Sequence, residues 1–188
     1  MADSITLKFE GMDRIKRALE NAGKQARKAA AFALNDTAKS IKTAASRDIR
    51  GRFNIQKNRL DPRIEITRAT PDRLVASVTM RAAPIPVADF GARPVTVTRR
   101  PLRRGVSVAI LKGERRKRLK HAFLQTMRSG HRGVFVRAGA SRLPILERKV
   151  ISPVSMWKDY IDQHMAEAGP YLRRRMAAQL ERLLKGQQ

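Results

Sequence analysis

A long run of small and aliphatic residues at helical spacing constrains the fold of this chain most. Apolar positions recur alternately every three and four residues from Met12 to Ile49, with charged residues on the other faces. The spacing predicts a helix that ends at Gly51. Asn21–Gly23 marks a kink or a break in it, since glycine inside a helix costs about 1 kcal/mol relative to alanine.

The middle of this stripe consists of alanines, which let a neighbouring helix or sheet approach closely. A helix of this length exceeds what a domain of 188 residues covers by itself, so we expect a partner subunit to pack against it. The residues expected at that subunit contact are Ala26, Ala29 and Ala33.

The rest of the chain carries short alternating segments that are typical of strands. Ile5, Leu7 and Phe9 share one face of the first, and a turn at Thr70–Arg73 joins the second and third into a hairpin. Ala83–Val87 is excluded as a central strand, because its two prolines lack the N–H that a ladder needs. The predicted strands are residues 4–10, 63–67, 74–80, 95–97, 106–110 and 134–136.

The C-terminal part returns to helical spacing. We expect one helix from Ser155, a break at Gly169–Pro170, and a final helix through Leu184. The fold class is therefore α+β, with a short N-terminal strand, a long N-terminal helix packed on a small antiparallel sheet, and C-terminal helices. Residues 1–154 form the α+β domain, and residues 155–188 are a C-terminal helical extension of the same domain.

The charge of the chain is strongly unbalanced. There are 41 Lys and Arg against 16 Asp and Glu, a net charge of +25, and residues 99–149 alone hold 16 basic and two acidic residues, hence +14. Such clustering is the pattern of phosphate binding, and the few aromatic residues there argue against base stacking. Contact with the backbone of duplex DNA is favoured over two alternatives, docking onto acidic protein neighbours and a solvated face. The expected phosphate contacts are Arg99, Arg100, Arg103, Arg104, Arg115, Arg116, Lys117, Arg118 and Lys120.

Motifs for catalysis, metals or cofactors give no convincing signal. The chain has no cysteine, and its three histidines fall in different predicted elements without an acid at ligand spacing, so we expect no metal site. Pro71-Asp72 and Glu147–Lys149 spell a nuclease motif, but they are too far apart in sequence. The segment Gly130–Gly133 lacks the remaining glycines and the Lys-Ser/Thr of a phosphate-binding loop. We therefore expect no enzyme and no cofactor.

Nothing in the sequence points to a membrane or to export. No apolar run approaches the roughly 20 residues of a membrane span, and the N-terminus lacks the form of a signal peptide. We expect synthesis and use in a cytoplasm, or release by lysis.

The loop made by Gly130, His131, Arg132 and Gly133 is the most distinctive local pattern. Two glycines flanking two large polar residues predict a turn with positive φ that leads into the strand at 134–136. We expect a structural hinge or a subunit-docking loop there, with Arg132 exposed, rather than a chemical site.

Several segments together resemble the minor tail protein Z family of lambda-like bacteriophages and prophages. The resemblance covers most of residues 25–156 and is carried by Ala31–Asn35, Pro84–Pro86, Ala122–Met127, Ser129–Arg137 and Leu143–Ile145. It implies a tail-completion component without catalytic residues, acting where the tail meets the head and related to ring-forming neck proteins.

On this resemblance we expect a ring, with six copies as the expected number, at the head–tail junction around the DNA. Its expected partners are copies of itself, the tail tube or tail terminator, the head–tail connector and, without sequence specificity, duplex DNA. Its expected location is the virion tail or neck, and the host cytoplasm during assembly. The alternatives are a basic protein that coats nucleic acid non-specifically, and an inhibitor or adaptor that binds an acidic protein surface.

Overall fold

The helix α2, Lys24–Arg52, is the longest N-terminal element of the chain. The computed structural model describes residues 5–8, 24–95, 105–150 and 153–185. These divide into two compact units, the first made of residues 1–47, 63–82 and 154–188 and the second of residues 48–62 and 83–153. The described elements confirm the predicted α+β class.

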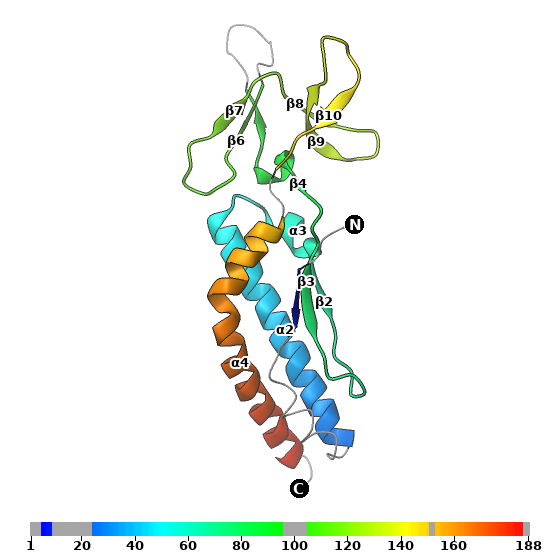
Figure 1. The fold of residues 1–188 in the computed structure, drawn as a ribbon, viewed down its shortest axis with the longest axis vertical. Helices are drawn as coiled ribbons and strands as arrows, with labels where there is room; N and C mark the ends of the chain where they lie inside the picture. Colours follow the sequence, from blue (N-terminus) through cyan, green and yellow to red (C-terminus); the bar gives the residue numbers. More distant parts are fainter. Residues whose placement is uncertain (1–4, 9–23, 96–104, 151–152, 186–188) are drawn as a thin grey trace. The chain divides into compact units, whose positions relative to one another are not determined.

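In the first unit, α2 lies between a helix and a small sheet (Figure 1). The helix is α4, Pro153–Lys185. The sheet has the strand order β1-β3-β2 and is antiparallel throughout, with β1 at Ile5–Lys8, β2 at Ile64–Thr67 and β3 at Ser77–Met80. Alternate residues of the central strand, Val78 and Met80, are fully buried, as the predicted alternation requires.

Polar side chains of α2 fix the β2–β3 hairpin against the helix. The amide of Asn35 donates to the carbonyl of Ala69 at 3.0 Å and accepts from its N–H at 2.8 Å. Lys42 donates to the carbonyl of Ile64 at 2.7 Å, and Arg27 donates to that of Pro71 at 2.9 Å. The bonds to Ala69 and Pro71 satisfy backbone groups at the turn end of the hairpin, and the bond to Ile64 satisfies a carbonyl at its open end.

The other side of α2 packs against α4, which runs antiparallel to it. The hydroxyl of Tyr160 donates to the carbonyl of Ile41 at 3.4 Å. A hydrogen bond with Ser40 lowers the pKa of Tyr171, and a second one with Arg175 acts in the same direction. Trp157 is fully buried and stacks on Tyr160, with ring centroids 5.6 Å apart.

The alanines of α2 are therefore buried on both sides of the helix. Ala29 and Ala31 are 4% and 5% exposed although they point about 200° apart on a helix with 3.6 residues per turn. Ala33 is fully buried, and Ala26 is half-buried. Close neighbours within the chain thus cover Ala29 and Ala33, and the subunit contact expected at Ala26, Ala29 and Ala33 stays a prediction.

The helix ends differ from those predicted. Met12 and the Asn21–Gly23 break lie outside the described residues, and α2 continues one residue beyond Gly51. The helix α4 begins at Pro153 rather than Ser155, and it is continuous through Gly169–Pro170, where a break was predicted.

Burial on both sides of Pro170 explains the continuous helix. Tyr160 and Leu172 are each 6% exposed, so an unbroken helix keeps both halves of α4 packed. That packing offsets the roughly 3 kcal/mol that proline costs inside a helix.

In the second unit the described residues form three small sheets. Their strand orders are β5-β6-β7, β10-β9-β8 and β11-β4, and every pair is antiparallel. The bounds are β4 Ile85–Pro86, β5 Arg93–Pro94, β6 Val106–Val108, β7 Lys117–Leu119, β8 Phe123–Thr126, β9 Arg132–Arg137, β10 Ile145–Glu147 and β11 Lys149–Val150. Short helical turns complete it at α3 (Lys57–Leu60), η1 (Asp61–Arg63, which leads into β2 of the first unit) and η2 (Val87–Phe90).

Asn54 connects the parts of the second unit. Its side-chain amide donates to the carbonyls of Phe90 and Ala109, at 3.4 and 3.2 Å, and its backbone N–H donates to the carbonyl of Ile110 at 2.8 Å. Phe90, Val106 and Val134 are fully buried and belong to the core of the second unit.

The strand predictions were confirmed in part. The hairpin of β2 and β3 and its turn are present, with paired backbone hydrogen bonds between Thr70 and Arg73 of 2.9 and 3.1 Å. Of the strand predicted at 95–97, Val95 lies just beyond β5, which ends at Pro94; Thr96 and Val97 lie outside the described residues, as does Phe9 of the first strand. The strands β7, β8 and β10 were not predicted.

Ala33→Leu should lower the free energy of unfolding of the full chain by about 1–3 kcal/mol, because the added side-chain atoms have no space on a fully buried site. Ala26→Leu, on the same helix but half-buried, is the matched control and should cost less. Urea denaturation followed by circular dichroism measures both. Equal losses for the two variants would contradict the tight packing of α2.

Candidate functional site

The sheet of β5, β6 and β7 carries the basic segment that the sequence singled out. In its register Arg93 lies opposite Ser107, which lies opposite Arg118, so these three residues share one face. The other face carries Val106 and Val108, which are 0% and 4% exposed. One face of the sheet is therefore core, and the arginines are on the face turned to solvent.

Arg116 adds a third guanidinium to this face and is held there by the protein. Its Nη2 donates to the carbonyls of Gly91 and Ser107, at 2.7 and 2.8 Å, and its Nε donates to the hydroxyl of Ser107 at 3.3 Å. A guanidinium has five N–H donors, and no bond from the two donors of Nη1 is formed with the residues that the structure describes. We name Arg93, Arg116 and Arg118 the arginine face.

The other basic residues of this segment are exposed as well. Arg115 precedes Arg116, Lys117 is in β7, and Lys120 lies in the turn after it. Arg99, Arg100, Arg103 and Arg104 lie outside the described residues. Arg93 was missed, because the sequence placed the strand two residues later; the cross-strand position that puts it beside Ser107 is visible only in the register.

The loop Gly130–Gly133 forms the tip of the β8–β9 hairpin. The N–H of Gly130 donates to the carbonyl of Met127 at 3.0 Å, and the N–H of Met127 donates to the carbonyl of His131 at 2.8 Å. Gly130 has a φ of 79°, which confirms the predicted positive φ at this glycine. Arg132 is exposed, as predicted.

Gly133 is required for a different reason from the one predicted. It lies inside β9 and is not among the positive-φ residues; instead the ring of Phe135 covers it. A Cβ built at Gly133 would lie 2.7 Å from Cζ of Phe135 and 2.8 Å from Oε1 of Glu147. The expectation of positive φ at Gly133 is therefore wrong, and close approach of an aromatic ring and a carboxylate takes its place.

Glu147 joins this loop to the neighbouring strand. Nε2 of His131 is 2.6 Å from Oε1 of Glu147, and Nζ of Lys149 is 3.6 Å from Oε2. The ring of His131 meets that of Phe135 edge-on, with centroids 6.4 Å apart. His131 thus anchors the hairpin tip to β10, and this arrangement of one histidine, one carboxylate and one lysine is structural.

In the described ranges, no group of three or more His, Cys, Asp or Glu residues is placed to hold a metal ion. Among the same residues, no helix is long and apolar enough to cross a membrane. Asp72, half of the nuclease motif, lies in the turn between β2 and β3, and Glu147 of the other half is engaged by His131.

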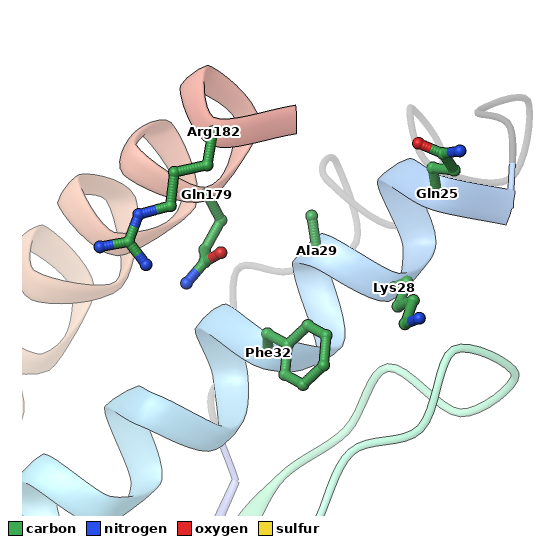
Figure 2. A pocket seen from close by; sticks show the side chains of 6 residues that line it. All are labelled: Gln25, Lys28, Ala29, Phe32, Gln179 and Arg182. Atoms are coloured by element: carbon green, nitrogen blue, oxygen red, sulfur yellow. The ribbon is translucent and has the colours of Figure 1, made fainter. Parts of the chain in front are cut away.

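A pocket of about 410 Å³ lies in the first unit, between the start of α2 and the end of α4. Gln179 and Arg182 project from α4 toward α2, where Ala29 forms part of the lining (Figure 2). Lys28, Gln25 and Phe32 also line it, so its described lining is basic and polar apart from Ala29 and Phe32.

Comparison with known proteins gives one match. A family model described as prophage minor tail protein Z (GPZ) matches residues 9–187, nearly the whole chain. No curated protein and no solved structure matches.

Gly133→Ala should destabilise the protein by about 1–3 kcal/mol, because the added methyl displaces Phe135 and the Glu147 carboxylate that His131 contacts. Gly139→Ala, in the next turn with open space around its Cβ position, is the control and should have little effect. Thermal unfolding of both variants measures the difference. A Gly133→Ala protein as stable as the control would show that the ring and carboxylate move aside without cost.

Proposed function

Because the chain belongs to the prophage minor tail protein Z family, we propose that this minor tail protein completes the tail as a ring at the head–tail junction, where it surrounds and positions the DNA. The role is structural: the chain holds DNA and neighbouring virion proteins and carries out no reaction. The ring brings the basic surfaces of several subunits to one axis, so that their fields add around the passing duplex.

The arginine face is the observation that carries this proposal. Arg93, Arg116 and Arg118 project from one solvent-exposed sheet face, and the spacing of neighbouring strands of about 4.8 Å separates β5 from β7 by roughly 10 Å. Arg116 is fixed by three hydrogen bonds to the protein, so little side-chain entropy is lost when a phosphate binds. A guanidinium held in place binds phosphate better than the flexible ammonium group of lysine does.

The aromatic residues near this face support backbone contact rather than base recognition. Phe135 is 6% exposed and lies against Gly133. Phe123 is half-buried, with the guanidinium of Arg137 5.7 Å from the centre of its ring. Neither ring offers an open platform on which a base could stack, so binding independent of sequence and of strand opening is expected.

Replacing Arg93 and Arg118 together by Gln should weaken duplex DNA binding and flatten the slope of log K against log salt by about 2 units, since each lost phosphate contact removes about 0.9. Arg173→Gln/Arg174→Gln, on the exposed side of α4, removes the same charge and is the control. Fluorescence anisotropy with a DNA duplex at several salt concentrations measures both slopes. An equal change in the two variants would assign the effect to net charge and not to the arginine face.

The proposed ring is tested by imaging the protein on purified tails. Negative-stain images of purified tails with this protein labelled should show a closed ring at the end that joins the head. The alternative function, a basic protein that coats nucleic acid, requires monomers or dimers spread along DNA and no ring. Labelled protein distributed along packaged DNA would therefore favour this alternative and count against the ring.

A further inference from the structure

The hairpin formed by β9 and β10 exposes a patch of apolar side chains. Leu146 lies opposite Val136 on one sheet face, and Ala138 and Pro144 continue this face, joined by a backbone hydrogen bond of 3.0 Å. Leu143 and Leu146 are 66% and 55% exposed, more than any other large apolar side chain of the described residues. We name Val136, Ala138, Leu143, Pro144 and Leu146 the hairpin patch.

The patch is built into the structure and is not a mobile tip. Nη1 of Arg137 donates to the carbonyl of Arg142 at 3.1 Å, which closes the turn on its own backbone. Val134, two residues before Val136 on the same strand face, is fully buried, so the face is anchored in the core at one end and open at the other. Few large apolar side chains are exposed among the residues that the structure describes, so an apolar surface of this kind indicates a contact with another molecule.

The segment that carries the patch is basic. Residues 123–150 contain six Lys and Arg and one acid, Glu147, which gives +5. Arg132, Arg137, Arg142 and Arg148 are all exposed. Glu147, whose carboxylate contacts His131 and Lys149 at 2.6 and 3.6 Å, offsets only one of the six positive charges.

The apolar patch and the basic residues of its segment together indicate the chemistry of the partner surface. An apolar centre needs an apolar counterpart, which duplex DNA with its charged backbone does not offer. A second copy placed against the same patch would bring two +5 surfaces together, and like charges across an interface are unfavourable. The matching surface is apolar at its centre and acidic at its rim.

We propose that the hairpin patch is the docking surface for another virion protein whose contact surface has an apolar centre and an acidic rim. The edge of the sheet next to the patch suits such a contact, since no strand pairs with the outer side of β10 among the residues that the structure describes. A partner strand can add there while its side chains cover Leu143 and Leu146. This docking is independent of the DNA contact, because it uses a different sheet of the second unit from the arginine face.

Leu143→Ser/Leu146→Ser in the full chain tests the docking surface by complementation of a prophage that lacks its own copy. Incorporation into purified particles, measured by quantitative mass spectrometry, should fall at least tenfold, while the melting temperature and the affinity for a DNA duplex stay unchanged. Val75→Ser, an exposed apolar residue of the first unit, is the control and should leave incorporation unchanged. Leu143→Met/Leu146→Met keeps the patch apolar and should restore it.

The partner is identified by replacing Leu143 with a photoreactive phenylalanine analogue and irradiating purified particles. The expected product joins this chain to a different virion protein, at a segment with more Asp and Glu than Lys and Arg. A crosslink only to another copy of this chain, a crosslink to DNA, or normal incorporation of the serine variant would each overturn the proposal. A serine variant that loses DNA affinity in parallel would assign the patch to DNA and overturn it too.

Discussion

In the first unit, α2 is covered on two sides, and this constraint determines which residues it can carry. One side lies against α4 and the other against the β2–β3 hairpin (Figure 1). A helix in this position can bury only small side chains where its neighbours come closest, and Ala29, Ala31 and Ala33 are all at most 5% exposed. Larger apolar side chains of the neighbours, Trp157, Met80 and Val78, are fully buried.

The helical spacing and the alternation of β2 and β3 could be read from the sequence because one face of each element is buried. The short strands of the second unit lack this signal. β7 reads Lys-Arg-Leu and exposes its first two residues, so only the backbone pairing with Val106–Val108 makes it a strand. Charged residues on an edge strand prevent its pairing with other chains. Because β7 is charged and does not alternate with apolar residues, its sequence does not predict a strand.

The site was predictable in composition but not in geometry. Sequence reasoning located the basic segment and the positive φ of Gly130, but it treated Arg115 to Arg118 as equivalent. The register separates them, since Arg116 is bonded to Gly91 and Ser107 and Arg93 joins from a strand far away in sequence. The sequence indicated that Gly133 is necessary, but for the wrong reason. The ring of Phe135 lies over Gly133 of the same strand, and no sequence pattern reveals such a contact.

Pro170 has a consequence for how the first unit opens. A proline inside α4 donates no N–H, so the helix lacks one backbone hydrogen bond near its middle. The turns beyond it, which carry Leu172 and the pocket residues Gln179 and Arg182, are held to the rest of α4 by one bond fewer than a regular helix provides. The free energy of local unfolding is lowest where backbone hydrogen bonds are missing. The amide hydrogens at this end of the helix should therefore exchange with solvent before those at the end that holds Trp157.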